Sequence, residues 1–230
     1  MHMSERIVLI TGANGGLGTF VTQSFLQQGD IVIGASLHMD SSEFPSPNFR
    51  ARSVDFTNEQ QVRDSIAQII ADFGRLDVLV HVLGGFAGGQ AIATTDNATW
   101  KRMQDLNLTS AFYVFRETIP HLRKSKNGRI VAIGSLAAKE PQADLGAYVT
   151  FKTALSTLVQ TVALENADAG LTANVILPGT MDTAANRQAM PKADFSKWLK
   201  PKRVAELILW LADERAVQIT GTVIPIEGNR

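Results

Sequence analysis

Short apolar runs alternate with helical patterns along almost the whole chain. Most of these runs are rich in Val, Ile and Leu, as in RIVLIT (6–11) and RIVAIG (129–134). The intervening stretches place apolar residues three and four positions apart, which is the spacing of one helix face. Strands that are apolar throughout, joined by helical crossovers, predict a parallel sheet covered by helices on both faces. We expect strands at 6–11, 30–35, 50–54, 77–83, 129–134, 172–177 and 222–226, and helices at about 97–123, 147–167 and 201–213.

Two more helices are expected near the N-terminus from their boundary signals. The first follows a glycine-rich turn at 11–18 and would be closed by Gly29. The second begins at Thr57-x-x-Gln60, which resembles a capping box. The Ser- and Pro-rich segment 36–49 is expected to be a loop crossover. Without repeats or a linker, residues 1–230 are predicted to form one doubly wound α/β domain.

Charge and composition exclude several classes of function. Lys+Arg 22 balance Asp+Glu 22, which argues against a nucleic-acid or anionic-membrane partner, since both bind basic surfaces. The chain has no cysteine and therefore no disulfide, thiol nucleophile or Cys-ligated zinc. No run approaches about 18 consecutive apolar residues, and MHMSERIVLIT lacks the layout of a signal peptide. We expect a soluble, cytoplasmic protein that acts on a small molecule and holds no metal.

The apolar run at 6–11 leads directly into TGANGGLG, Thr11 to Gly18. A pyrophosphate must approach the backbone closely at such a turn, and a Cβ would block it. The N-terminus of the following helix offers free N–H groups and a partial positive charge. A glycine-rich turn in the first strand–helix unit predicts a Rossmann-like dinucleotide site. Its expected contacts are Gly12, Asn14, Gly15, Gly16, Leu17 and Gly18.

Tyr148 and Lys152 stand four residues apart in GAYVTFKTAL, inside the predicted helix at 147–167. Residues at this spacing lie one above the other on a helix face, so an ammonium group would neighbour the phenol. A free tyrosine has a pKa of about 10, too high for efficient proton transfer near neutral pH. The ammonium in a partly desolvated site is expected to lower that pKa. The competing interpretation is two amphipathic side chains sharing a solvated helix face, because YxxxK also occurs by chance.

Further stretches carry a resemblance to a known family. DFT contains Asp55, LNLTSAF contains Asn107, VAIGS ends at Ser135, and PGTMDT begins at Pro178. Ser135 precedes Tyr148 by 13 residues, and ITGTVIPIEG stands close to the C-terminus. In this order the motifs resemble the short-chain dehydrogenase/reductase family over essentially all 230 residues.

The resemblance implies a role for each motif. Tyr148 would donate a proton as a hydride reduces a carbonyl or imine carbon, and Ser135 would hydrogen-bond the substrate heteroatom. Lys152 would tune Tyr148 and hold the nicotinamide ribose, while Asn107 would position a proton-relay water. Taken alone, Ser135 is a turn or cap serine and Asn107 a buried polar residue bonded to backbone; the complete set favours catalysis. The resemblance adds cofactor contacts at Asp55, Phe56, Tyr148, Lys152, Pro178, Gly179, Thr180 and Thr183.

The segment after the fourth expected strand departs from the family pattern. His81-Val82-Leu83-Gly84 stands where the family usually has NNAG. We interpret His81 as a buried structural residue, because it lies in an apolar strand. Gly84 and Gly85 are expected to let the chain pass close to the cofactor.

Two stretches carry a narrower resemblance. GGFAGGQA and LPGTMDTAANRQAMPKADFSKW are similar to the dihydropteridine reductases, a group within the family, which implies a quinonoid dihydropterin as substrate. Ser135 and Asn107 depart from that group and suit carbonyl or alcohol chemistry. Segment 179–200 is expected to be a substrate lid. The expected substrate contacts are Phe86, Met181 and Trp198.

The end of the second expected strand bears on the choice between NAD(H) and NADP(H). An acidic residue there would accept hydrogen bonds from the adenosine ribose and disfavour a 2′-phosphate. Ser36 occupies the position, followed by Leu37 and His38. Without the carboxylate the repulsion is absent, yet no arginine follows to bind the phosphate. The sequence slightly favours NADP(H), with Ser36 as a cofactor contact.

Three other functional classes fit less well. A non-catalytic dinucleotide sensor would keep the glycines but need not keep Tyr148, Lys152 and their partners. Sugar-nucleotide epimerases usually carry a larger C-terminal region, and the superfamily's enoyl-thioester reductases place the lysine further from the tyrosine, where Leu155 stands here. We expect an NAD(P)(H)-dependent oxidoreductase acting on a small carbonyl or alcohol. Its expected partner is a second copy of the chain, in a dimer or tetramer joined by the helices near 100–123 and 147–167.

Overall fold

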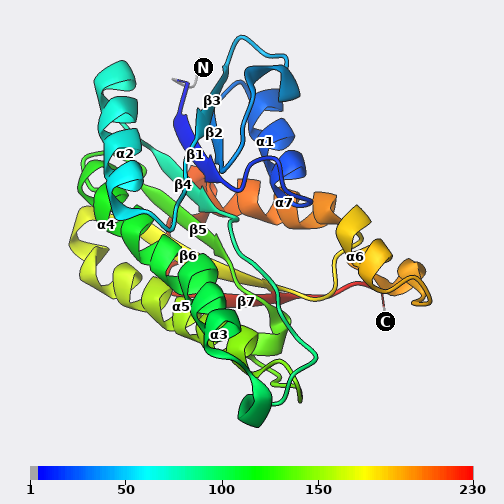
Figure 1. The fold of residues 1–230 in the computed structure, drawn as a ribbon. Helices are drawn as coiled ribbons and strands as arrows, with labels where there is room; N and C mark the ends of the chain where they lie inside the picture. Colours follow the sequence, from blue (N-terminus) through cyan, green and yellow to red (C-terminus); the bar gives the residue numbers. More distant parts are fainter. Residues whose placement is uncertain (1–4, 230) are drawn as a thin grey trace.

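A computed structural model describes residues 5–229 of the chain. Within this range the strands form one seven-stranded parallel sheet in the order β3-β2-β1-β4-β5-β6-β7 (Figure 1). The strand order reverses beside β1, since the chain runs outward through β2 and β3 and then returns to β4. This topology confirms the predicted doubly wound, Rossmann-like fold. The strands are β1 (Ile7–Thr11), β2 (Ile31–Ser36), β3 (Phe49–Ser53), β4 (Val78–His81), β5 (Arg129–Ile133), β6 (Thr172–Pro178) and β7 (Val223–Ile226).

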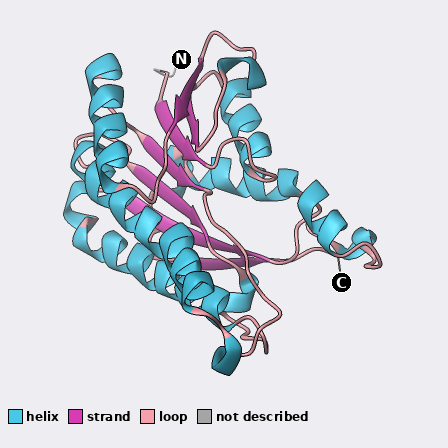
Figure 2. Cartoon of the chain, viewed as in Figure 1, coloured by secondary structure: helices cyan, strands magenta, loops and turns pink. Residues whose placement is uncertain are grey.

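Helices cover both faces of the sheet (Figures 1 and 2). α1 (Gly18–Gln27) and α7 (Pro201–Leu211) pack together on one face. α2 (Glu59–Phe73), α4 (Ser110–Leu122) and α5 (Gly146–Glu165) cover the other face, and α3 (Asn97–Gln104) packs against α5. The short α6 (Ala184–Ala189) projects beyond the sheet beside the C-terminus. None of the helices in residues 5–229 is long and apolar enough to cross a membrane.

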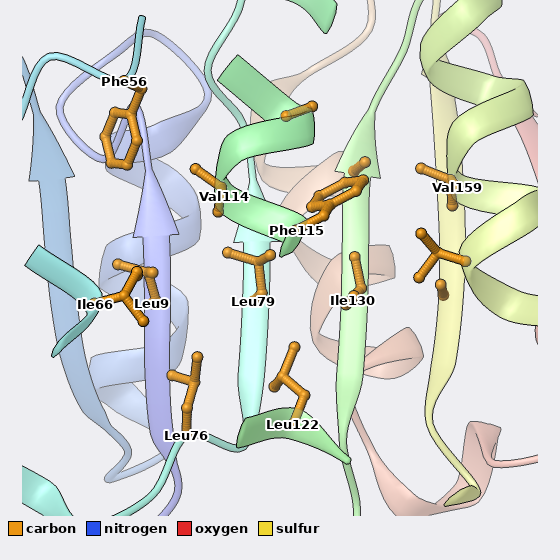
Figure 3. Packing of buried hydrophobic residues seen from close by; sticks show 14 of the residues in the cluster. Leu9, Phe56, Ile66, Leu76, Leu79, Val114, Phe115, Leu122, Ile130 and Val159 are labelled. Carbon is orange, nitrogen blue, oxygen red and sulfur yellow. The ribbon is translucent and has the colours of Figure 1, made fainter. Parts of the chain in front are cut away.

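The sheet is buried on both faces because successive strand residues point to opposite sides. Leu9, Leu79 and Ile130 enter the core under α2, α4 and α5, as Figure 3 shows. Their neighbours Val8 and Val131 enter the second core under α1 and α7. Full burial of a Val, Leu or Ile side chain contributes about 1.5–3 kcal/mol, so these two cores hold the strand ends in fixed positions.

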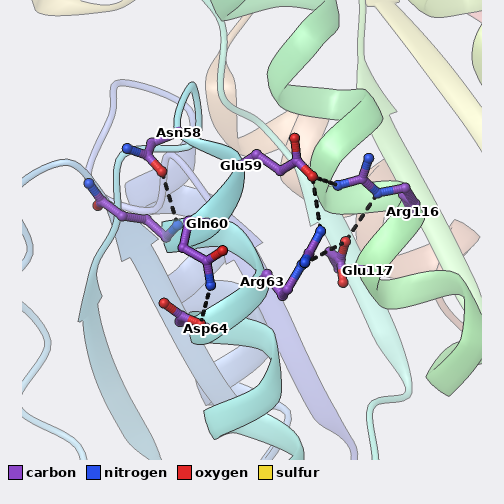
Figure 4. A network of polar contacts seen from close by, with 8 residues as sticks. Asn58, Glu59, Gln60, Arg63, Asp64, Arg116 and Glu117 are labelled. Atoms are coloured by element: carbon purple, nitrogen blue, oxygen red, sulfur yellow. Dashed lines mark hydrogen bonds and ion pairs between the residues drawn. The ribbon is translucent and has the colours of Figure 1, made fainter.

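α2 begins at a different cap from the predicted one. Asn58 is its N-cap residue, and its side-chain oxygen accepts a hydrogen bond from Gln61 N–H (3.1 Å; Figure 4). Thr57 instead donates its hydroxyl to Asp55 Oδ1 (2.6 Å). The predicted Thr57–Gln60 capping box is therefore wrong, because the threonine is used in the preceding turn. At the end of α1 the cap is Gln28, and Gly29 follows it with a φ of +86°.

Ion pairs join the first turn of α2 to α4 (Figure 4). Glu59 Oε1 accepts hydrogen bonds from Arg116 Nη2 (2.8 Å) and from Arg63 Nη2 (2.9 Å). The Glu59 and Arg116 side chains are 44% and 38% exposed, so each pair contributes about 0–1 kcal/mol. The position of α4 is therefore fixed mainly by its apolar face.

The helix predicted at 97–123 consists of three consecutive pieces. α3 ends at Gln104, a π-helical turn covers Asp105–Thr109, and α4 continues from Ser110. A π-helical turn inserts extra backbone into a helix and is frequent at functional sites. Asn107 lies in this turn and is fully buried.

Candidate active site

The glycine turn between β1 and α1 has the geometry of a phosphate cradle. Gly12 adopts a φ of +70°, and Gly15 N–H donates to Gly12 O (3.1 Å), which closes the turn. A Cβ at Gly18 would lie 1.9 Å from Gly12 O, so α1 can start this close to the strand only with glycine there. Leu17, the N-cap of α1, supplies no side-chain cap, which leaves the helix N-terminus to an anion. These residues fit the pyrophosphate of a nicotinamide dinucleotide.

Gly18→Ala should weaken dinucleotide binding by about 10- to 100-fold, because overpacking at this level costs about 1–3 kcal/mol. The added Cβ must push the start of α1 away from Gly12 O. Gly74→Ala is the control for general destabilisation, since it strains a glycine with a φ of +70° at the end of α2, away from the glycine turn. Titration with NADH, followed by fluorescence, measures the effect. Equal affinities for the two variants would contradict the close packing of strand and helix.

The segment after β6 closes the cradle from the other side. A Cβ at Gly16 would lie 2.9 Å from Thr183 Cγ2, so the glycine turn and Thr183 are in direct contact. Thr183 is the N-cap of α6, and Pro178 is the last residue of β6. The structure thus brings together two groups of predicted cofactor contacts that are far apart in the sequence.

The two ends of the predicted lid, 179–200, are joined to each other. Met181 and Leu199 form a parallel bridge, and Leu199 N–H donates to Thr180 O (2.9 Å). Trp198 is buried and packs on Phe195 with ring centroids 4.7 Å apart. Trp198 therefore anchors the segment, and its contact with a substrate stays a prediction.

Tyr148 lies in the first turn of α5, with its ring edge-on to Phe86 at a centroid distance of 5.1 Å. Ser135, which follows β5, lies close enough to the Tyr148 hydroxyl to affect its pKa. Burial raises the pKa of Tyr148 above the ordinary 10.0, and the Ser135 hydroxyl opposes this rise with a smaller effect. The predicted lowering of this pKa is wrong for the chain on its own, because desolvation of the phenolate outweighs the effect of Ser135.

Lys152 lies one turn further along α5 and is only 4% exposed. Its Nζ donates a hydrogen bond to Ile133 O (2.9 Å) at the end of β5. Burial lowers the pKa of Lys152 to about 8, so the ammonium keeps its proton at neutral pH but holds it weakly. The hydrogen bond to this main-chain carbonyl holds the Lys152 ammonium at the carboxyl edge of the sheet.

Asn107 holds the chain that follows β4. Its Oδ1 accepts from Gly85 N–H (3.1 Å), and its Nδ2 donates to Gly85 O (3.0 Å) and Met103 O (3.1 Å). A Cβ at Gly84 would lie 2.8 Å from Lys152 Nζ and 2.9 Å from Asn107 Oδ1, so a larger residue there would have to displace the ammonium or the amide. The Asn107 side chain therefore positions the Gly84–Gly85 turn, and the relay water stays a prediction.

The contacts predicted for the adenosine end lie at the carboxyl ends of β2 and β3, which are neighbours in the sheet. Asp55 Oδ1 accepts from Thr57 N–H (2.9 Å) and shapes the turn after β3. The Phe56 ring is buried in the core (Figure 3), which leaves only its main chain for a dinucleotide. Ser36 is 7% exposed, and its Oγ has no hydrogen-bond partner in residues 5–229.

His81 is fully buried, which confirms its interpretation as a structural residue. Its Nδ1 lies 3.0 Å from Thr11 Oγ1, and its ring packs edge-on against Phe115. Burial, with a smaller contribution from the charge of Lys152, lowers the pKa of His81 to about 3. The imidazole is therefore neutral at physiological pH. No group of His, Asp and Glu side chains in the described part of the chain could hold a metal ion.

A polar hollow beside the start of α5 was not predicted from the sequence. Gln90, Thr95, Thr99 and Asp144 are among its lining residues. Asp144 adopts a φ of 63°, and its carbonyl accepts from Gly89 N–H (2.9 Å), which ties the two walls together. A single aspartate in the left-handed region leaves little trace in a sequence, since Asp tolerates many turn conformations.

Known proteins resemble the chain along its whole length. Residues 6–194 match the family model for the short chain dehydrogenases. The 2,3-dihydro-2,3-dihydroxybenzoate dehydrogenase of Escherichia coli (strain K12) is 29% identical over 247 residues, spanning 100% of this chain and 98% of that enzyme. The structure of the ligand-free aldohexose dehydrogenase of Thermoplasma acidophilum has a TM-score of 0.89 at 30% identity, covering 98% of this chain and 93% of that one. ElxO with NADP bound has a TM-score of 0.91 at 28% identity, covering 98% of both chains.

These matches support the family and a nicotinamide dinucleotide cofactor. They do not show the narrower resemblance to the dihydropteridine reductases. The matched range contains the glycine turn, the Asn107 turn, Ser135 and the Tyr148–Lys152 pair. The chain belongs to the short-chain dehydrogenase family of oxidoreductases.

Proposed function

We propose that the protein transfers a hydride between NAD(H) or NADP(H) and a small carbonyl or alcohol substrate, with Tyr148 as general acid and base. The observation that carries this proposal is that Ser135 lies beside Tyr148 at the carboxyl edge of the sheet. Lys152 and the Gly84–Gly85 turn lie beside that pair, and the glycine cradle opens at the same edge.

Each side chain has a distinct task in this reaction. The bound dinucleotide supplies or accepts the hydride. Tyr148 Oη gives its proton to the substrate oxygen in reduction and takes it back in oxidation, while Ser135 Oγ hydrogen-bonds that oxygen. Desolvation makes the phenolate form of Tyr148 unfavourable. The positive charge of the buried Lys152 ammonium favours that form and so offsets part of this effect. Phe86 packs edge-on against the Tyr148 ring and helps to hold it in place.

The polar hollow beside α5 supports a hydroxylated substrate. Gln90, Thr95, Thr99 and Asp144 offer hydrogen-bond donors and acceptors there. Residues 145–147, which directly precede Tyr148, also line the hollow. The Escherichia coli relative is named for a ring diol and the Thermoplasma acidophilum relative for an aldohexose. A secondary alcohol on a hydroxylated ring is the substrate class that these features favour.

A substrate panel tests the function. Ring diols and aldohexoses are offered with NAD⁺ or NADP⁺, and ketones and a quinonoid dihydropterin with NADH or NADPH, while the absorbance of reduced nicotinamide is followed. We expect turnover of at least one hydroxylated ring compound. Turnover of the dihydropterin alone would reassign the substrate. Dinucleotide binding without any turnover would contradict an enzyme and favour a sensor.

A homo-oligomer is part of the same proposal. The faces of α4 and α5 that point away from the sheet expose Phe112 (46%) and Leu164 (81%). Apolar side chains exposed on neighbouring helices suit contact with a second copy of the chain. Sedimentation of the purified protein reports its oligomeric state.

A further inference from the structure

The segment between β2 and β3 folds back onto the glycine turn. Asn14 in that turn donates from Nδ2 to His38 O (2.8 Å) and to Glu43 Oε1 (3.3 Å). A carboxylate that is distant from the glycine turn in the sequence thus lies against the residues expected to bind the dinucleotide. Sequence spacing did not single out Glu43, because its position depends on how the loop folds.

Glu43 is held in this position by the loop itself. It ends a short 3-10 helix, Ser41–Glu43, whose N-cap is Asp40, and Asp40 N–H donates to Glu43 Oε1 (3.0 Å). Met39, just before this helix, is buried, and Ser53 on β3 hydrogen-bonds both its N–H (3.0 Å) and its carbonyl (3.2 Å). The capping box formed by Asp40 and Glu43 therefore fixes the position of the carboxylate beside the glycine turn.

The glycine turn and the loop between β2 and β3, which surround this carboxylate, contain no Lys or Arg. The sequence has no Lys or Arg from 7 to 49, whereas Asp40 and Glu43 lie together in the loop. Arg50 Nη1 donates to the main-chain carbonyls of Pro47 (2.6 Å) and Phe49 (2.9 Å). Arg52 is in an ion pair with α2. The loop expected to meet the adenosine end of a dinucleotide, 37–48, therefore carries two carboxylates and no Lys or Arg.

We propose that Glu43 accepts hydrogen bonds from the adenosine ribose hydroxyls and makes the protein select NAD(H) over NADP(H). In this fold that role is usual for an acidic residue near the end of the second strand. Ser36 stands at the strand end here but is buried, so the loop supplies the carboxylate in its place. A 2′-phosphate would bring about −1.5 to −2 further charges to an anionic surface. The inference rests on the proposed nicotinamide-dependent function and reverses the slight preference for NADP(H) expected from the sequence.

Equilibrium binding without substrate tests the inference. The dissociation constants of NAD⁺ and NADP⁺ are measured by calorimetry for the wild type, Glu43→Gln and Glu206→Gln. Glu206 is an exposed carboxylate on α7, so its variant has the same change of charge at a remote place. We expect the wild type and Glu206→Gln to prefer NAD⁺ by on the order of 100-fold, the scale of like charges a few ångströms apart near a surface. Glu43→Gln should narrow this ratio by about tenfold or more, mainly through tighter binding of NADP⁺.

The ionic strength provides a second readout. Added salt should reduce the discrimination against NADP⁺ in the wild type more than in Glu43→Gln, because it screens the repulsion. Equal or tighter binding of NADP⁺ by the wild type, or an unchanged ratio in Glu43→Gln, would overturn the inference while leaving the proposed function intact. Binding of neither dinucleotide would overturn both. A preference for NAD⁺ that depends on Glu43, without turnover of any substrate, would support the inference and sink only the catalytic proposal.

Discussion

Tyr148→Phe should lower kcat by about 100- to 10,000-fold, the range associated with loss of a general acid or base. The substitution removes only the hydroxyl, so the ring keeps its edge-on contact with Phe86 and its packing against the cluster of Met103, Ala147 and Phe151. The dissociation constant of the dinucleotide should change far less than kcat, because the substitution leaves the glycine cradle on β1 and α1 intact. Steady-state kinetics on the substrate identified by the panel, with binding measured in parallel, give both numbers.

Tyr113→Phe is the matched control for this substitution. Tyr113 is the other tyrosine of the chain and lies on α4, where its ring contacts Phe112. Its variant should keep wild-type kcat. If Tyr148→Phe retained more than about a tenth of the wild-type kcat, Tyr148 would not be the proton donor.

Because burial raises the pKa of Tyr148, the oxidation rate of the wild type should also rise with pH through the neutral range, since the phenolate is the base.

The strand–helix alternation predicted the sheet well because its signal is repeated in every unit. The central strands β1, β4 and β5 are almost entirely apolar and fully buried, which is typical of a parallel sheet covered on both faces. The exact end of a helix was harder to predict where two neighbouring residues could both act as its cap. At the start of α2 both Thr57 and Asn58 can cap a helix, and the turn after β3 takes the threonine. The local sequence pattern could not show which residue caps the helix, because the Thr57 hydroxyl donates its hydrogen bond to Asp55 instead.

The identities of the candidate site residues could be predicted, but their surroundings could not. The spacing of Tyr148 and Lys152 is a property of one helix, whereas the pKa of each depends on burial by segments far away in the sequence. Asn107 likewise meets Gly85 only because a π-helical turn places its amide there. Glu43 lies in a loop with no periodic pattern, so only the folded chain shows that it contacts Asn14.

Lys152→Met should abolish most activity and yet stabilise the fold at neutral pH. Burial lowers the pKa of Lys152 from 10.5 to about 8, which corresponds to about 3 kcal/mol of cost for keeping the ammonium in the folded protein. The variant loses the hydrogen bond from Nζ to Ile133 O, worth about 1 kcal/mol. The free energy of unfolding at pH 7 should therefore increase by about 2 kcal/mol, a gain in stability at the expense of function.

The pH dependence separates this explanation from simple repacking. Below about pH 8 the lysine is protonated in both folded and unfolded states, so the cost is complete. Between about 8 and 10.5 the unfolded chain binds the proton and the folded chain does not, so the wild type gains stability relative to the variant as pH rises. Urea unfolding across this range should show the advantage of Lys152→Met shrinking by about 3 kcal/mol. Lys139→Met, at an exposed lysine, should show no such trend. A pH-independent difference for Lys152→Met would mean that the ammonium is solvated in the folded protein, and the proposed tuning of Tyr148 by a buried charge would fail with it.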